Sequence, residues 1–360
     1  MISQLLEILQ MSIVLVAIKM VVAVGVVLGA VPMLVWMERK VSARFQRRVG
    51  PNRVGPFGLL QSAADALKLM WKEDFFPNNT DRIVFLAGPL LTFLPGVIAF
   101  GMIPVGRASG AHFLGQGGVL AVSYLQMGLL GLLAVSSLAS YGIAFGGWAS
   151  NNQYSLLGGI RSSAQLISYE IVMVLSVLAL VMTTGTFNLA DIAQQQQGNV
   201  LPAWNLFTRP LTFLLFLIAA FAETNRAPFD LPEAEQELVG GYHTEYTGMR
   251  YAWFMLGEYA GMWAMCSIIT TLFLGGWTLP HAWIDWIGAY PWYFEALVSF
   301  GVFIAKVVAM VFFFMWVRWT FPRFRWDQLM KLGWKTLIPI AIVNILLTAV
   351  AMEFGGWYVR

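Results

Sequence analysis

The chain has 360 residues and a net charge of +3, and 58% of its residues are hydrophobic whereas only 11% are charged. Soluble proteins average about 25% charged residues, so this composition indicates a membrane protein and excludes a separate soluble domain with its own core. One cysteine, Cys266, and three scattered histidines exclude a disulfide framework, and we expect no haem, iron–sulfur cluster or other metal on this chain.

Eight apolar runs follow one another along the chain. A spanning helix needs about 20 apolar residues, and all the runs approach or exceed this length, the fifth being the shortest. The segment 1–10 lacks a basic region and a cleavage site, so the first run is expected to stay in the protein. We predict an all-α, polytopic, single-domain membrane protein with eight transmembrane helices, at about 11–36, 83–105, 119–145, 164–184, 207–223, 251–274, 295–317 and 335–352.

The first loop holds the first informative motif. RVGP occurs twice, at 48–51 and 53–56, and its Gly-Pro pairs favour turns. Residues 57–72 then show an amphipathic helical pattern that is too short and too polar to span, so this helix should lie at the cytoplasmic interface. The basic residues here could reflect only the preference of cations for the cytoplasmic side. Glu38 is harder to explain in that way, and it could pair with a neighbouring arginine.

The segment 221–246 is the most charged part of the chain, with six of the 19 acidic residues. Glu223 follows an apolar run of 13 residues, about 20 Å of helix, which is short of the ~30 Å hydrocarbon core, so Glu223 should lie below the membrane surface. Pro228 and Pro232 oppose a regular helix. We predict a broken acidic loop at 222–250, whose later glutamates could equally form a solvated surface.

Four ionisable residues are expected inside the membrane. Glu170 and Glu258 lie six or seven residues into their runs, so that they share one depth with Glu223 on consecutive spans. Carboxylates at such depth face protein or water, and each singly could be structural, but three together favour a line of protonatable groups. Lys306, near the middle of the seventh run, suggests a proton site or a counter-charge to a carboxylate.

The distribution of basic residues predicts the orientation. Of the 22 Lys and Arg residues, 17 lie in the first, third, fifth and seventh loops, whereas the other loops and the C-terminus hold only Arg107, Arg209 and Arg360. Because Lys and Arg are enriched in cytoplasmic loops, the odd-numbered loops should face the cytoplasm and both termini the outer side.

Three stretches carry a family resemblance. They are WMERKVSARFQRRVGPNRVGPFGLLQSAADALKLMWKED (36–74), RSSAQLISYE (161–170) and AETNRAPFDLPEAEQELVGGYHTEY (222–246). With the eight spans, they resemble the quinone-site membrane subunit of respiratory complex I, the proton-pumping NADH:quinone oxidoreductase, over essentially the whole chain. The resemblance implies a subunit that joins the membrane arm to the hydrophilic arm and forms much of the chamber for its substrate, quinone.

The resemblance also implies partners and site residues. The partners would be the hydrophilic-arm subunits, one of which holds the terminal iron–sulfur cluster, the small membrane subunits of the pump and the lipid bilayer, without nucleic acid. The location would be the bacterial inner membrane. The quinone chamber or arm-docking site would include Glu38, Arg39, Arg48, Arg53 and Arg226. With Lys306, the proton path would comprise Glu170, Glu223, Asp230, Glu233, Glu235 and Glu258.

Two other classes of protein share some of these features. Membrane-bound hydrogenases and related ion-pumping complexes contain a homologous subunit without a quinone, but the intact twin RVGP loop favours the quinone form. A secondary transporter could also place acidic residues at mid-membrane between broken helices. Such transporters often show two repeated halves, and no broken segment in the other half matches 222–250.

Overall fold

Helices form most of the structure, a computed structural model that describes residues 2–108, 118–122, 125–198, 203–231, 239–280 and 291–355, with side chains from Val14 onward. Within these ranges, strands β1 and β2 form a short antiparallel pair in which Gly106 faces Leu120. In chain order the elements are α1 (Ile2–Phe45), η1 (Pro56–Gly58), α2 (Gln61–Trp71), α3 (Arg82–Met102), β1 (Gly106–Arg107), β2 (Val119–Leu120), α4 (Gly128–Ala149), α5 (Gln153–Thr184), α6 (Leu189–Gln195), α7 (Asn205–Thr208), α8 (Pro210–Glu223), η4 (Gly241–His243), α10 (Gly248–Phe273), α12 (Trp292–Thr320), α13 (Trp326–Lys331), the π-helical turn η5 (Leu332–Leu337) and α14 (Ile338–Gly355).

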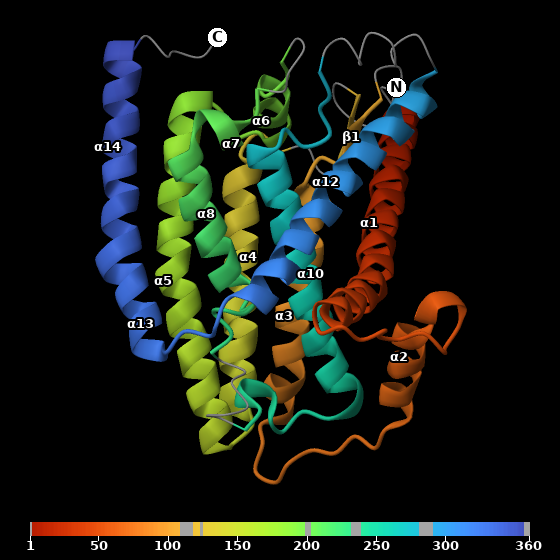
Figure 1. The fold of residues 1–360 in the computed structure, drawn as a ribbon. Coiled ribbons are helices and arrows are strands. Elements are labelled where there is room, and N and C mark those ends of the chain that lie inside the picture. Colours follow the sequence, from red (N-terminus) through yellow and green to blue (C-terminus); the bar gives the residue numbers. More distant parts are fainter. Residues whose placement is uncertain are drawn as a thin grey trace.

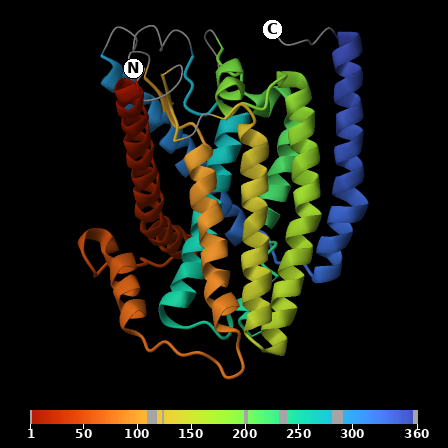
Figure 2. The same ribbon diagram turned by 180° about the vertical axis from the view of Figure 1, so that it is seen from behind.

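The long helices stand side by side in one bundle, which α12 crosses obliquely (Figure 1). The first turn of α1 and the last turn of α14 lie at the same end of this bundle, whereas α2 lies beside the opposite end (Figures 1 and 2). We refer to these as the terminal end and the α2 end. Helix α14 stands at the edge of the bundle, so much of its surface is exposed.

Six helices are long and apolar enough to cross a membrane, which makes the chain an integral membrane protein. Two of the eight predicted spans do not meet this criterion. Helix α8 has 14 residues, about 21 Å. Helix α10 is long enough, with 26 residues, but its sequence, which includes Arg250 and Glu258, is not apolar enough. The predicted count of eight spans therefore depends on two helices whose charges or length require a protein environment.

Several helix ends differ from the apolar runs that predicted them. The third run was expected from residue 119, but Val119 and Leu120 pair with β1, and α4 begins at Gly128. The fourth run was expected from residue 164, but α5 begins at Gln153, where Asn152 caps it by accepting a hydrogen bond from the Tyr154 amide. Apolar runs mark what lies in hydrocarbon, and a helix continues beyond them wherever caps and tertiary contacts stabilise it.

Small residues allow α3, α4 and α10 to pack closely. A Cβ added to Gly142 of α4 would lie 2.5 Å from Thr92 Oγ1 of α3, and one added to Gly96 would lie 3.1 Å from Ala260 of α10. In membranes, such small residues let helix backbones approach without a hydrophobic driving force. This packing fixes the relative positions of three helices that line the site described below.

The segment that follows α1 turns back and places α2 against it. Trp36 donates a hydrogen bond to the Phe57 carbonyl over 3.1 Å, and the Ser62 hydroxyl donates to the Pro32 carbonyl over 2.9 Å. Helix α2 lies within the range predicted for the amphipathic helix, 57–72, and exposes large apolar residues such as Trp71. Its position beside the bundle suits a helix that lies at an interface.

Candidate functional site

A buried ion-pair cluster joins α1, α10, α12 and the loop after α8. The Arg226 Nη1 donates to Glu38 Oε2 over 2.9 Å, and the Arg226 Nε lies 2.8 Å from Glu258 Oε1 in an ion pair that is not aligned as a hydrogen bond. The Tyr259 hydroxyl donates to Glu38 Oε2 over 3.0 Å, and Arg318 binds the other carboxylate oxygen of Glu38. We call these five residues the Arg226 cluster.

Three members of the Arg226 cluster are almost closed to solvent, whereas Arg318 is one-third exposed. The exposed fractions of the Arg226, Glu38 and Glu258 side chains are 6%, 11% and 12%. The Arg226 guanidinium also lies over the ring of Tyr259, 4.4 Å from its centroid, in a cation–π contact. Burial alone would lower the pKa of Arg226, but Glu258 and Glu38 together raise it above its ordinary value. The guanidinium is therefore a fixed positive charge that two carboxylates share.

Gln165 of α5 holds the loop that carries Arg226. Its side-chain amide contacts three acceptors from the last turn of α8 and this loop: Ala222 O at 2.9 Å, Asn225 Oδ1 at 3.1 Å and Phe229 O at 2.9 Å. Gln165 is fully buried, so these hydrogen bonds compete with no solvent. Residues 224–231 of the predicted loop 222–250 are irregular, and this side chain from a neighbouring helix fixes them.

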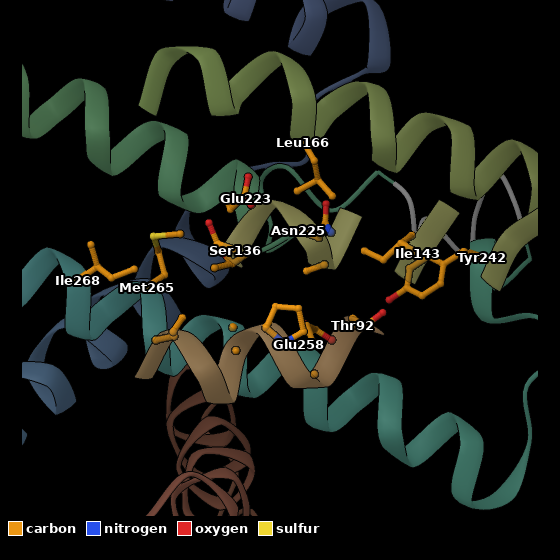
Figure 3. A pocket seen from close by; sticks show the side chains of 18 residues that line it. Thr92, Ser136, Ile143, Leu166, Glu223, Asn225, Tyr242, Glu258, Met265 and Ile268 are labelled. Atoms are coloured by element: carbon orange, nitrogen blue, oxygen red, sulfur yellow. The ribbon is translucent and has the colours of Figure 1, made fainter. Parts of the chain in front are cut away.

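A cavity of about 70 Å³ lies beside the Arg226 cluster, between α3, α4, α5, α8 and α10. Figure 3 shows Glu223 from α8 and Glu258 from α10 on different walls of this cavity. Thr92, Ser136 and Asn225 add polar side chains to its lining. A water molecule needs about 10–15 Å³ of cavity volume measured in this way, so this cavity has room for several water molecules. Glu223 Oε2 is buried without a protein partner among the described residues, which makes it a natural ligand for such water.

The structure brings together some of the carboxylates that were predicted to form a line, with an arginine between two of them. Glu223 and Glu258 share the cavity, and Glu170 of α5 lies close enough to Glu223 for mutual repulsion. Beyond Glu258, however, Arg226 separates it from the next carboxylate, Glu38. Glu223 and Glu258 therefore share a cavity, with Glu170 nearby. From Glu258 the charges then alternate through Arg226 to Glu38.

Asp230 lies later in the same loop, near enough to Arg318 and Arg226 to feel their charges. Its Oδ2 accepts a hydrogen bond from Arg323 Nη2 over 2.9 Å, and its Oδ1 is buried without a described partner. Burial raises the pKa of Asp230, although the Arg323 charge opposes this shift. Because Arg318 lies in the last turn of α12 and Arg323 just beyond it, the end of this helix binds two of the predicted acidic residues. Glu233 and Glu235 lie outside the described residues.

Lys306 has partners other than those expected. Its ammonium donates to the carbonyl oxygens of Leu274, Gly276 and Thr278, at 2.8, 2.9 and 3.1 Å, and lies 5.2 Å from the ring centroid of Trp204. The expected counter-charge to a carboxylate is not found among its described contacts. Lys306 instead caps the end of α10, where backbone carbonyls lack helical partners and the helix dipole favours a cation.

The predicted arginines of the first loop lie apart from the Arg226 cluster. Arg39 pairs with Asp65 of α2, and both side chains are partly exposed. Arg48 and Arg53, in the two RVGP motifs, are exposed. The neighbouring arginine expected to pair with Glu38 is therefore not one of these: its partners are Arg226 and Arg318, distant in sequence.

Sequence reasoning missed three residues of the site, namely Arg318, Tyr259 and Gln165. Arg318 was counted only among the loop charges, although its position at the end of an apolar run was a usable signal. Tyr259 directly follows Glu258, and nothing in its spacing distinguishes it from an ordinary core tyrosine. Among the residues that the structure describes, no group of three or more His, Cys, Asp or Glu side chains could hold a metal ion.

The fold and the site define an integral membrane protein in which a buried ion-pair cluster adjoins an internal acidic cavity. A family model described as NADH dehydrogenase matches residues 18–349. The chain therefore belongs to the NADH dehydrogenase family, and the resemblance found in its sequence is confirmed.

Curated relatives match nearly the whole chain, and each is the H subunit of an NADH-quinone oxidoreductase. The relative from Flavobacterium johnsoniae is 48% identical over 315 residues, which cover 87% of this chain and 88% of the relative. The relative from Protochlamydia amoebophila is 49% identical over 316 residues, 88% of this chain and 91% of the relative. The relative from Bacillus cytotoxicus is 48% identical over 328 residues, 91% of each chain.

Proposed function

We propose that this chain is the membrane subunit of a proton-translocating NADH:quinone oxidoreductase that forms much of the quinone chamber and couples quinone reduction to proton movement. The names of its relatives support the enzyme and its substrate class, quinone. In this proposal the hydrophilic-arm subunits supply electrons from their terminal iron–sulfur cluster. The resulting change of charge and protonation passes through this chain to the small membrane subunits of the pump. This chain itself holds no redox cofactor.

The Arg226 cluster is the observation that carries the coupling part of the proposal. It connects Glu38, which ends the apolar part of α1 beside the twin RVGP loop, with Glu258, which lines the internal cavity. Because one guanidinium serves both carboxylates, a change of charge near Glu38 alters how strongly Arg226 holds Glu258. Reduction of a quinone takes up protons and changes the local charge, so it can act on this cluster from the α1 side.

The cavity carboxylates would complete the path. Closely spaced carboxylates cannot all ionise in a low dielectric, so a proton or charge that arrives at Glu258 shifts the protonation of Glu223 and then of Glu170. We assign Asp230, with Glu233 and Glu235, to the entrance of this path from the quinone side. Lys306 would fix the terminal end of α10 through its three carbonyl contacts, so that Glu258 on the same helix keeps its position.

The exposed arginines of the first loop suit a different role. Arg48 and Arg53 lie at the α2 end without a carboxylate contact among the described residues, and Arg39 joins α1 to α2 through Asp65. We propose that this loop borders the chamber entrance and docks the hydrophilic arm. Exposed arginines bind carboxylates of a partner with planar, two-point geometry, which gives docking its specificity.

The proposal includes a location and a topology. We place the chain in the bacterial inner membrane with eight spans, counting α8 and α10, and with both termini outside. Cysteines introduced at Asn52 and Asn151 should then react with an impermeant thiol reagent only from the cytoplasmic side, and one at Asn199 only from outside. The background should carry Cys266→Ser, since this buried native thiol is the only other cysteine. Reversed labelling at any site would overturn this topology.

The Glu38→Gln variant tests the carrying observation. Glutamine keeps the shape of the side chain but removes the negative charge that Arg226 and Arg318 share. In the assembled complex we expect quinone reductase activity to fall at least about tenfold, whereas oxidation of NADH by an artificial acceptor upstream stays normal, because only the quinone end is affected.

Glu73→Gln is the matched control for this test. It removes an exposed carboxylate from the same loop, so both activities should match the wild type. Normal quinone turnover in fully assembled Glu38→Gln complex would contradict the role of the Arg226 cluster in coupling.

A further inference from the structure

A crevice at the terminal end of the bundle lies far from the Arg226 cluster. It has a volume of about 280 Å³ and lies between the ends of α5 and α14 and the beginning of α8. Thr183, Thr208 and Arg209 supply polar groups, whereas Leu211, Leu347 and Ala351 supply an apolar wall. Polar groups at the helix ends above an apolar groove match the division of a lipid into a headgroup and its chains.

Arg209 is the only charged residue that lines this crevice among the described residues. Its Nη1 donates to Asn205 Oδ1, but its Nε is buried and has no hydrogen-bond partner among the described residues, none of whose carboxylates pairs with it. A buried guanidinium nitrogen without an acceptor is costly, and a phosphate oxygen is an acceptor that guanidinium binds well. The chemistry of Arg209 therefore suits an anion such as a phosphate.

The position of Arg209 in the sequence strengthens this argument. With Arg107 and Arg360, it is one of three basic residues assigned to the even-numbered loops and the C-terminus, so the general preference for cytoplasmic basic residues does not account for it. Proline follows at position 210 and begins α8, which fixes the arginine at the helix start. An anion there also faces the favourable end of the α8 dipole.

The apolar wall of the crevice opens along α14. Leu347, which lines it, is 58% exposed, and Leu346 and Val350 on the same helix are exposed to a similar degree. Helix α14 stands at the edge of the bundle (Figure 1), so this wall faces the surroundings of the protein rather than its interior. In a membrane protein those surroundings supply acyl chains.

We propose that this crevice is a binding site for one glycerophospholipid. Its phosphate would lie against Arg209, near the Thr183 and Thr208 hydroxyls, and an acyl chain would lie along Leu347 and Ala351 between α8 and α14. The phosphate would accept hydrogen bonds from the Arg209 guanidinium. The lipid would also fill the space between α14 and α8. Beside this space, Asn344 of α14 donates a hydrogen bond to the Thr212 hydroxyl of α8 over 3.0 Å.

Site-specific photocrosslinking in the assembled, purified complex tests this proposal. Leu347→p-benzoylphenylalanine places the probe in the crevice, and mass spectrometry of the irradiated subunit detects a covalent adduct with the mass of a phospholipid. In detergent micelles that contain limiting phosphatidylglycerol, we expect a lipid adduct at this position. Adding Arg209→Gln should lower its yield roughly tenfold, because a charge-assisted hydrogen bond to the phosphate is lost, whereas Arg209→Lys should retain most of it.

Val350→p-benzoylphenylalanine is the matched control. It lies on the same helix and is exposed, but it does not line the crevice, so its lipid adducts should not depend on Arg209. If Arg209→Gln fails to assemble, Ala351→Phe, which narrows the crevice and leaves the arginine intact, should lower the adduct at position 347 instead. A crosslink from 347 to a partner polypeptide, or lipid adducts at 347 that are indifferent to both substitutions, would overturn the proposal.

Discussion

Replacement of Arg226 by glutamine is expected to destabilise the protein by about 3–5 kcal/mol, the usual cost of breaking a buried ion pair from one side. The substitution leaves Glu258 without its positive partner and Glu38 with Arg318 alone, in surroundings where both side chains are nearly closed to solvent. We expect little assembled complex, with a markedly lower midpoint of thermal unfolding in whatever is recovered.

Three variants make this measurement specific. Arg39→Gln removes a partly exposed pair with Asp65 and should cost at most about 1 kcal/mol. Arg226→Lys keeps the charge but not the two-point geometry, so its stability should lie between the wild type and Arg226→Gln. Arg226→Gln combined with Glu258→Gln removes the uncompensated carboxylate and should recover part of the loss. Normal assembly and an unchanged unfolding midpoint in Arg226→Gln would show that the Arg226 cluster does not stabilise the fold.

Glu223→Gln should lower quinone reduction and proton pumping together, by about tenfold or more, while the complex assembles normally. Glutamine keeps the size of the side chain but cannot release or accept the proton of a carboxyl group. Because Glu223 Oε2 has no protein partner among the described residues, the substitution breaks no described contact at that atom, and stability should change little. Glu223→Asp, which keeps an ionisable group with a shorter reach, should be milder.

The deciding measurement is the quinone reductase rate together with the proton-to-electron ratio, after the subunit content has been checked. Glu353→Gln is the control, since it removes an exposed carboxylate at the terminal end of α14. Loss of assembly in Glu223→Gln would indicate a structural carboxylate. A normal rate with normal pumping would remove Glu223 from the proposed path.

The sequence predicts well those residues of the site whose placement costs free energy for a reason that the neighbouring residues in the sequence reveal. A carboxylate after a short apolar run, as at Glu223, is expensive wherever the chain folds, so its burial beside protein or water could be predicted without tertiary information. Likewise, Pro228 opposes a regular helix, and residues 224–231 of the predicted loop are irregular in the structure. The family membership followed from long motifs in the same segments.

The pairings within the site could not be predicted in this way. Arg226 lies 188 residues from Glu38, and Arg318 lies 280 residues from it, so no spacing rule connects them. Lys306 reads as an unpaired charge in sequence because its partners are backbone carbonyls, which every residue carries. Gln165 is similar, since an amide in a helix gives no sign that it will bind three acceptors from another segment.

The short length of α8 has an electrical consequence. In the proposed topology the first residue of α8 lies at the outer surface, and its 14 residues carry the helix about 21 Å. Glu223 would then lie roughly a third of the hydrocarbon thickness from the cytoplasmic side. A proton that reaches Glu223 from that side would cross about a third of the membrane voltage, or roughly 0.8 kcal/mol per 100 mV. The proton affinity of this carboxylate would then vary with the membrane potential. A high membrane potential would in this way alter the turnover rate, because the short length of α8 sets the depth of Glu223.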